Sequence, residues 1–260
     1  MNLVELGKIK TIVEANLPLK TDNAGKMIRS KIGLYFLKSL GGEVNETFLK
    51  FLAVVELVHN ASLFHDDVID NEDERRNSPA LNKIYGEKTS VLYGNITLSN
   101  AMTILLEIGD IGLITEMNNC VKKMCYGELI QQEQLNKIPT INEYIKKTRL
   151  KTASLFRYMM SGLSMLLNNK CRTELESFGN NYGIGFQICN DLKDVSSDIK
   201  SGVYTAPVIY ADSINIDSVA IDKTKDLIDN YLKRARGVLD FLEESEYRTA
   251  LIGVIKCLKI

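Results

Sequence analysis

The spacing of prolines and apolar residues constrains the fold of this chain more than any other feature. The 260-residue sequence contains four prolines, Pro18, Pro79, Pro139 and Pro207. Between them apolar residues recur every three or four positions, as Phe48, Leu52 and Val55 do, which places their side chains on one face of a helix. No alternating β pattern persists beyond a few residues. We therefore predict an all-α fold of about ten helices, in a single domain covering residues 1–260.

Capping signals mark several of the predicted helix ends. Asn45 precedes a long apolar pattern that we interpret as one helix over residues 46–71, and Gly41-Gly42 ends the helix before it. Thr140 and Glu143 follow Pro139 with the spacing of a capping box. We expect many of the helices to be roughly 18 to 26 residues long.

The composition excludes several classes of function. Hydrophobic residues make up 45% and charged residues 25% of the chain, and the net charge of −1 gives no bulk attraction for nucleic acid or anionic membranes. Five scattered cysteines and two histidines form no zinc framework, and such thiols are typical of a reducing compartment. The amphipathic N-terminus does not resemble a signal peptide, and no stretch approaches the ~20 apolar residues of a membrane span. We expect a soluble cytoplasmic protein.

An acidic stretch, "HDDVIDNEDERR", ends the predicted helix over residues 46–71. Asp66 and Asp70 lie at i and i+4, so their carboxylates project from one face, with Asp67 beside them. Carboxylates at the C-terminal end of a helix cost stability unless a cation compensates. Magnesium, which prefers oxygen ligands shared with substrate phosphates, is one such cation. A solvated acidic helix end is the alternative, and this stretch alone does not decide between them.

A second acidic face occurs in "GIGFQICNDLKDVSSD". Asn190, Asp194 and Asp198 lie at i, i+4 and i+8 on one side of another apolar helix, next to Asp191. Two such faces are what a magnesium–diphosphate site requires. Lysine and arginine residues that could bind the diphosphates include Lys26 and Arg29, which we predict to share one helical face.

Five motifs follow one another in the order "GKMIR", "HDDVID…RR", "GELIQ", "KTASLF" and "GFQICNDLKD". With them the chain resembles the trans-isoprenyl diphosphate synthases, the polyprenyl synthetase family, from about Gly25 to Pro207. The resemblance implies the isoprenoid synthase fold, a bundle of mostly antiparallel helices around a deep apolar cavity, and a homodimer. It also implies an enzyme that condenses isopentenyl diphosphate with an allylic diphosphate to give a linear trans-polyprenyl diphosphate. Magnesium would assist the ionisation of the allylic substrate, with about three ions per active site.

The resemblance assigns a role to each matching residue. Asp66, Asp67, Asp70, Lys151 and Gln187 are the predicted catalytic residues. The predicted magnesium ligands are Asp66, Asp70, Asn190, Asp191 and Asp194. The allylic diphosphate is assigned to Arg75, Lys151, Thr152 and Gln187. Isopentenyl diphosphate is assigned to Lys26, Arg29, His59 and Arg76.

The sequence departs from the family pattern in its second acidic motif. Asn190 replaces the usual aspartate, and Val203 follows Gly202 where the family has a lysine. Lys193 or Lys200 could supply the missing positive charge. These departures leave two alternatives open, a non-catalytic or weakly active subunit of a heteromeric synthase and a class I terpene cyclase. A cyclase would have no use for residues that bind a second diphosphate.

The length of the product is predicted from the helix that bears Asp66. A helical turn rises ~5.4 Å, about one extended isoprene unit, so the residues one turn before Asp66 form the first possible floor of the cavity. These residues are Ala61 and Ser62, both small, whereas Phe64 points away from the Asp66 face. The sequence therefore predicts geranylgeranyl or longer products, up to octaprenyl.

Overall fold

Two compact units make up the structure, a computed structural model that describes residues 3–19, 25–75, 78–168 and 171–258. Unit 1 comprises residues 1–37 and 43–115, and unit 2 comprises residues 38–42 and 116–260. Both units are built almost entirely of helices, so the all-α fold is confirmed. A single domain over residues 1–260 stays a prediction.

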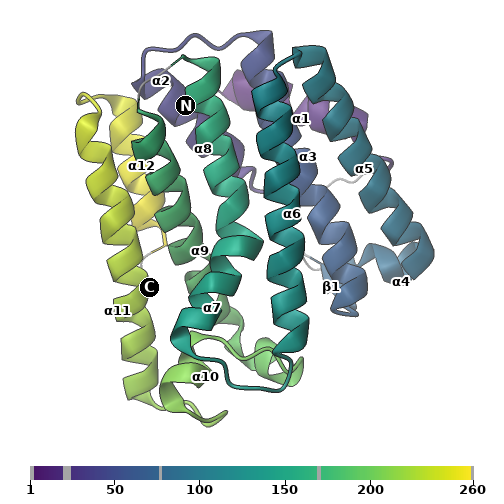
Figure 1. Cartoon of the computed structure of the whole chain (residues 1–260), viewed down its shortest axis with the longest axis vertical. Helices are drawn as coiled ribbons and strands as arrows, with labels where there is room; N and C mark the ends of the chain where they lie inside the picture. The colour runs from purple at the N-terminus through teal and green to yellow at the C-terminus, as the bar shows by residue number, and fades with distance from the viewer. Residues whose placement is uncertain (1–2, 20–24, 76–77, 169–170, 259–260) are drawn as a thin grey trace. The chain divides into compact units, whose positions relative to one another are not determined.

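Unit 1 is centred on the apolar helix α3 (Glu46–Ile69), which packs along α5 (Glu87–Ile108) and α1 (Leu3–Asn16) (Figure 1). The other elements are most of α2 (Ile28–Ser39), the short α4 (Leu81–Tyr85) and a hairpin of β1 (Glu74–Arg75) and β2 (Ser78–Pro79). The hairpin was not predicted, because its strands are too short to show an alternating pattern.

Helix α3 begins where the sequence predicts. The side chain of Asn45 accepts a hydrogen bond from the backbone N–H of Phe48 at 3.0 Å, which satisfies one of the unpaired donors of the first turn. Near the other end of α3, the imidazole of His65 packs on Gly94 of α5. A Cβ at position 94 would lie 2.3 Å from Nε2 of His65, so any larger residue there would displace the His65 ring.

Unit 2 is centred on α9 (Arg172–Lys200), which packs against α8 (Ser154–Leu166) and α11 (Ser218–Val238) (Figure 1). An aromatic cluster fills the contact between α8 and α9, with the Phe156 and Tyr182 rings 5.3 Å apart and Tyr182 stacked on Phe178. The remaining elements are α6 (Ile111–Glu133, its first turn in unit 1), α7 (Ile141–Thr148), the π-helix η1 (Arg149–Ala153), α10 (Ala206–Ala211), the 3₁₀-helix η2 (Leu239–Phe241) and α12 (Glu246–Lys256).

The capping box at the start of α7 is confirmed. The Thr140 hydroxyl accepts from the backbone N–H of Glu143, and the Glu143 carboxylate accepts from the backbone N–H of Thr140 at 2.8 Å. By contrast, the single turn of π-helix that follows α7 was not predicted. Such turns often occur at functional sites.

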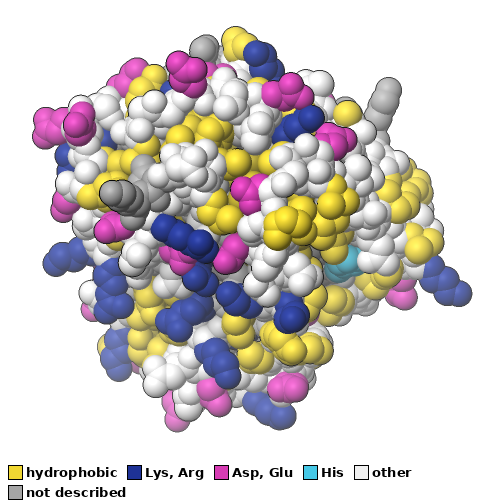
Figure 2. Space-filling model, turned by 45° about the horizontal axis from the view of Figure 1, so that its top comes forward, with side chains coloured by type: hydrophobic (Ala, Val, Ile, Leu, Met, Phe, Trp, Pro, Cys, Tyr) yellow, Lys and Arg dark blue, Asp and Glu magenta, His cyan; other side chains and the backbone are white. Residues whose placement is uncertain are grey.

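The described part of the chain includes two helices long and apolar enough to cross a membrane by length and composition, α3 and α5. The prediction that no stretch approaches this limit is therefore wrong. In α3 the apolar window is 67% buried, as in the core helix of a globular protein, whereas in α5 it is 28% buried. Both signs of charge share the face drawn in Figure 2, in keeping with the net charge of −1.

Candidate active site

The first acidic motif lies at the C-terminal end of α3. Asp66 and Asp70 are half-buried one turn apart, as predicted, whereas Asp67 is only 2% exposed. The buried Asn82 side chain donates to the backbone carbonyls of Asp67 and Glu72, at 2.9 and 3.1 Å. These bonds fix the turn that follows α3, and the fixed turn positions the carboxylates of Asp66 and Asp70.

Other predicted residues of unit 1 lie along α3. His59 is half-buried two turns before Asp66, and the Ser62 hydroxyl donates to the His59 carbonyl at 2.9 Å. Ala61 is 2% exposed, so its small side chain lies in a packed region.

The predicted basic pair at the start of α2 has a different geometry from the one expected. Lys26 is exposed in a turn before the helix, because Met27 adopts a positive φ of 45° and α2 begins only at Ile28. Arg29 is 6% exposed within the first turn of α2. The prediction that the two share one helical face is therefore wrong.

The start of α2 is fixed by a buried carboxylate. Glu56, 3% exposed on α3, accepts hydrogen bonds from the backbone N–H and the hydroxyl of Ser30, at 2.9 and 2.8 Å. This contact sets the position of the neighbouring Arg29. Arg75 lies in β1 but its side chain is outside the described atoms, and Arg76 lies outside the described residues.

In unit 2, Lys151 and Thr152 both lie in the π-helix η1. The ammonium of Lys151 forms an ion pair with Glu128 of α6. Gly127 permits the close approach of α6 to η1, because a Cβ at position 127 would lie 2.4 Å from the backbone nitrogen of Lys151. The "GELIQ" and "KTASLF" motifs thus meet through direct contact of η1 with α6.

A chain of hydrogen bonds connects η1 to the second acidic motif. The Thr152 hydroxyl donates to Oε1 of Gln187 at 2.8 Å, and Nε2 of Gln187 donates to Oδ1 of Asp191 at 2.6 Å. The other Asp191 oxygen, Oδ2, accepts from the hydroxyl of Tyr144 at 2.5 Å. Asp191 is 6% exposed, and each of its oxygens is engaged by one neutral donor. Burial and the charge of Asp191 raise the pKa of Tyr144 well above its usual value, so this phenol remains a donor.

The remaining side chains of the second motif are less enclosed. Asn190 is half-buried, Asp194 is exposed, and Asp198 is half-buried two turns after Asn190. Burial, together with the charges of Asp191 and Asp194, raises the pKa of Asp198 to about 7.

Lys147 is a residue of this region that the sequence analysis missed. Its side chain is 94% buried (6% exposed), and its ammonium lies 5.1 Å from the centre of the Tyr144 ring. Burial lowers the pKa of Lys147, and the charges of Asp191 and Asp198 oppose that shift. Tyr144 lies three positions before Lys147 and Lys151 four positions after it, and this helical spacing is the signal that could have identified it. Lys193 and Lys200, the predicted replacements for the missing lysine, are both exposed.

Oxygen atoms dominate the donors that the two motifs offer to a cation. Within the described ranges, no three His, Cys, Asp or Glu side chains converge closely enough to hold a metal ion by themselves. Glu128, Asp191 and Asp194 carry negative charge in unit 2, and Asp198, with its pKa of about 7, is about half ionised at pH 7, beside the cations Lys147 and Lys151. The carboxylate donors fit a hard divalent ion that also binds substrate phosphates.

Comparisons with known proteins agree with this arrangement. A sequence profile described as polyprenyl synthetase matches residues 10–236. The chain is 32% identical, over 266 aligned positions, to a decaprenyl-diphosphate synthase of Dictyostelium discoideum, covering 88% of this chain and 58% of that protein. It is 30% identical to a mitochondrial solanesyl-diphosphate synthase of rice, covering 74% and 54%. The chain thus spans about half the length of the curated relatives it matches.

Solved structures share the fold. A polyprenyl synthase from Caulobacter crescentus, in complex with calcium and isoprenyl diphosphate, matches with a TM-score of 0.90 at 20% identity, over 98% of this chain and 94% of that one. A heptaprenyl diphosphate synthase from Staphylococcus aureus matches with a TM-score of 0.88 at 22% identity, over 99% and 97%.

Proposed function

Since the chain belongs to the polyprenyl synthetase family, we propose that it condenses isopentenyl diphosphate with an allylic diphosphate, head to tail, to give a linear trans-polyprenyl diphosphate. The observation that carries this proposal is the hydrogen-bonded chain from Thr152 through Gln187 to Asp191. Residues of two motifs 35 positions apart in the sequence form one fixed array of polar groups. An array of this kind is suited to holding a diphosphate in one orientation.

Magnesium is the proposed cofactor, and it would supply the positive charge that stabilises the departing diphosphate. Asp66 and Asp70 would be magnesium ligands on α3, and Asn190 and Asp194 would be magnesium ligands on α9. We assign Asp191 chiefly a positioning role, because Gln187 and Tyr144 already engage its two oxygens. Asp67 would support its neighbours from its buried position.

The cations are divided between the two substrates. Lys151, Thr152, Gln187 and Arg75 would bind the allylic diphosphate, and Lys26, Arg29, His59 and Arg76 would hold isopentenyl diphosphate. The carbon–oxygen bond of the allylic diphosphate would break first to give an allylic cation, the double bond of isopentenyl diphosphate would attack that cation, and the released diphosphate would accept the proton. We further propose that Lys147 supplies the positive charge that Val203 removes from the loop after α9, since it is the buried cation beside Asp191 and Asp198.

Products of geranylgeranyl length or longer are supported by the small residues Ala61 and Ser62 on α3 and by the names of the curated relatives. Ala61→Phe should shorten the product by several isoprene units with little loss of the first condensation. Chromatography of the products provides the measurement, and Ser62→Ala, which keeps a small side chain, is the control. An unchanged product from a folded Ala61→Phe variant would show that Ala61 only packs helices.

A homodimer and a cytoplasmic location complete the proposal. Large apolar side chains are exposed along α5, namely Val91, Leu92, Ile96 and Leu106. An apolar helix face of this kind is typical of a surface that another chain covers. Sedimentation velocity of the purified chain would reveal a dimer, and a monomer at micromolar concentration would contradict this part of the proposal.

Incubation of the purified chain alone with both substrates and magnesium tests the function. The proposal predicts a linear polyprenyl diphosphate. A cyclised hydrocarbon would identify a terpene cyclase. No product from the chain alone, but product after addition of a partner chain, would identify a subunit of a heteromeric synthase. The intact first acidic motif favours the catalytic reading over the last of these.

A further inference from the structure

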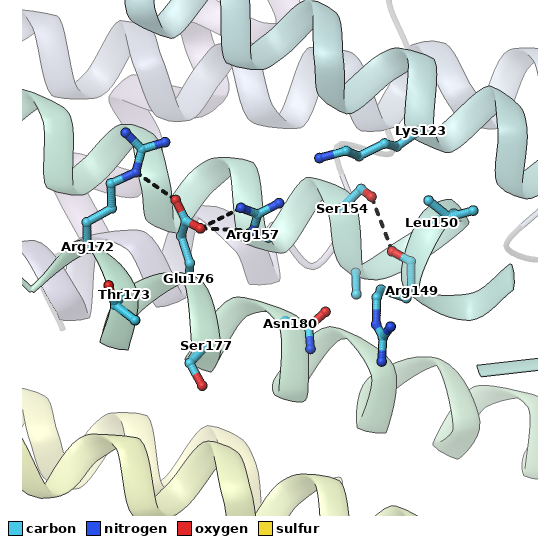
Figure 3. Close-up of a pocket in the computed structure, with 11 residues that line it drawn as sticks. Lys123, Arg149, Leu150, Ser154, Arg157, Arg172, Thr173, Glu176, Ser177 and Asn180 are labelled. Carbon is cyan, nitrogen blue, oxygen red and sulfur yellow. Dashed lines mark hydrogen bonds and ion pairs between the residues drawn. The ribbon is translucent and has the colours of Figure 1, made fainter. Parts of the chain in front are cut away.

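A polar pocket of about 600 Å³ opens within unit 2, outside the proposed catalytic residues. It lies between α6, the segment where η1 joins α8, and the first half of α9 (Figure 3). Lys151 and Thr152 belong to the same π-helix, yet neither lines the pocket, and neither do Gln187 and Asp191. The pocket is therefore a separate feature.

Positive charge predominates in its lining. Lys123, Arg149, Arg157 and Arg172 contribute four cations, and Glu176 is the one carboxylate among the residues that line the pocket. Leu150 and Ala153 are the apolar residues of the lining, the aliphatic parts of longer side chains add apolar surface, and Asn180 contributes an amide. Four cations against one carboxylate suit a ligand that carries an anionic group and also has an apolar part.

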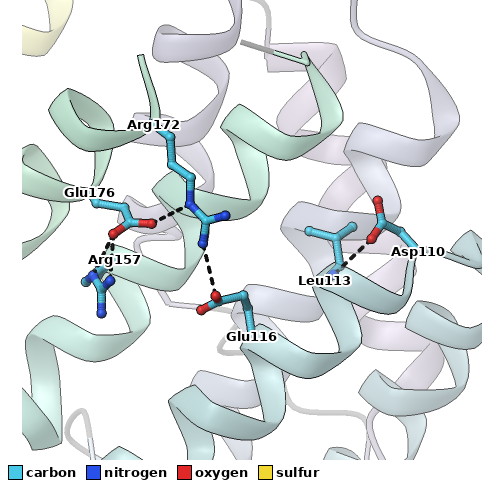
Figure 4. Close-up of polar contacts among 6 residues, drawn as sticks. All are labelled: Asp110, Leu113, Glu116, Arg157, Arg172 and Glu176. Carbon is cyan, nitrogen blue, oxygen red and sulfur yellow. Dashed lines mark hydrogen bonds and ion pairs between the residues drawn. The ribbon is translucent and has the colours of Figure 1, made fainter. Parts of the chain in front are cut away.

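Glu176 does not neutralise all the positive charge of the pocket, because its carboxylate is already paired with two arginines. Arg157 donates from Nε and Nη2 to Oε2 of Glu176, at 3.0 and 2.6 Å, and Arg172 donates from Nε to Oε1 at 2.7 Å. Arg172 also donates to Glu116 of α6 at 3.0 Å (Figure 4). Burial opposes ionisation of Glu176, but the hydrogen bonds from Arg172 and Arg157 outweigh it and lower its pKa. The network is thus a rigid frame of fixed charges.

Lys123 and Arg149 are outside this network. Among the described residues neither forms an ion pair, and the Lys123 side chain extends to the side of the pocket on which Arg157 lies (Figure 3). Two cations that approach one another repel, unless an anion lies between them. Lys123, Arg149 and Arg157 therefore each offer N–H donors from the lining of the pocket.

We propose that this pocket binds an anion that bears a diphosphate group. Arginine forms bidentate bonds to phosphate oxygens, and three cations with N–H donors match a diphosphate better than a singly charged carboxylate. The volume exceeds that of inorganic diphosphate and leaves room for an organic remainder at the solvent side. The site is independent of the proposed catalytic function, since it shares none of its residues.

Isothermal titration of the full-length chain with inorganic diphosphate, in the presence of EDTA, tests this site. The chelator removes the divalent ions on which the acidic motifs depend. We expect Lys123→Ala with Arg149→Ala to weaken binding about tenfold or more. The matched double variant Lys122→Ala with Lys146→Ala removes two cations of exposed residues outside the pocket and should bind like the wild type.

A second double variant separates the pocket from the catalytic motifs. Lys26→Ala with Lys151→Ala removes two predicted substrate ligands and should retain the metal-independent binding. The proposal is overturned if the wild type does not bind diphosphate under these conditions, or if the pocket variant binds as tightly as the wild type. It is equally overturned if the catalytic variant alone abolishes binding. Titration with inorganic phosphate, which we expect to bind more weakly, shows whether both phosphoryl groups are recognised.

Discussion

The acidic ends of α3 and α9 have similar sequences but are held in different ways. On α3, the turn below Asp66 and Asp70 is fixed by Asn82, which binds backbone carbonyls and leaves the half-buried carboxylates of the motif to other partners. On α9, Asp191 is itself bound by Tyr144 and Gln187 within a buried network of side chains. One motif is positioned through the backbone and the other through its side chains.

This difference bears on how the acidic motif of α9 could function with a neutral residue at position 190. Asn190 brings no charge to α9, whereas the same region contains the buried cation Lys147 and a network that fixes Asp191. The α3 motif keeps all three of its aspartates. We therefore expect the acidic motif of α3 to account for most of the metal-dependent rate, and the acidic motif of α9 to set the affinity for metal and diphosphate.

Loss of a carboxylate from α3 should have the largest effect. Asp66→Ala or Asp70→Ala should lower kcat by about a thousandfold or more, because a magnesium ligand is lost, with little change in thermal stability. Steady-state kinetics and a thermal melt provide the two measurements. Asp73→Ala removes an exposed carboxylate of the same stretch, paired with Lys83 at 2.9 Å, and should remain active. Near-normal turnover of folded Asp66→Ala would refute the assignment.

The network on α9 should show a smaller effect on rate together with a loss of stability. Tyr144→Phe removes a donor to a buried carboxylate, which typically costs about 1–3 kcal/mol, so we expect a loss of about tenfold to a hundredfold in kcat and a lower Tm. Tyr126→Phe, at an exposed position on α6, is the control. If Tyr144→Phe melts and reacts like the wild type, the Tyr144–Asp191 bond does not position Asp191.

Lys147 provides a prediction that depends on pH. Lys147 lowers the pKa of Asp198, so Lys147→Met should raise that pKa further above about 7. At pH 7 more Asp198 would then be protonated, but this restores at most about half of the positive charge that the substitution removes, so the region becomes more negative and the magnesium concentration for half-maximal rate should fall severalfold. The difference from the wild type should grow as the pH rises above 7, because Asp198 then ionises and no longer offsets the lost charge. Lys193→Met, at an exposed position on α9, should not shift the curve, and a shift of the same size at every pH would contradict the electrostatic explanation.

Asn190 should produce the smallest effect. Asn190→Asp replaces a neutral oxygen ligand by a charged one, so the half-maximal magnesium concentration should fall a few-fold. A magnesium titration of the initial rate measures it. An unchanged curve would place Asn190 outside the metal site.

The long helices and both acidic motifs could be predicted because their signals are local. The Asn45 cap, the apolar face of α3 and the spacing of Asp66 and Asp70 depend only on neighbouring residues, and the structure reproduces them. The resemblance assigned Thr152 and Gln187 to one substrate, and the structure brings them into direct contact.

The features that were missed depend on tertiary contacts. The π-helix η1 lies where Lys151 closely approaches Gly127 of α6, a contact that no local pattern encodes. A lysine within a polar stretch such as "EYIKKTRLK" is normally solvated, and only packing against α9 buries Lys147. The positive φ of Met27, which separates Lys26 from α2, likewise has no sequence signal, since methionine seldom adopts this conformation.

The central question is whether both motifs act in the same chemical step. The most direct test measures the metal-dependent release of diphosphate from farnesyl diphosphate in the absence of isopentenyl diphosphate. Asp66→Ala and Asp194→Ala should each slow the release. If the two motifs act as one unit, the double variant should be little slower than the slower single variant, because losses within one unit are not additive. Losses that multiply would show that the motifs do not act as one unit, and wild-type release by Asp194→Ala would show that α9 takes no part in the ionisation step.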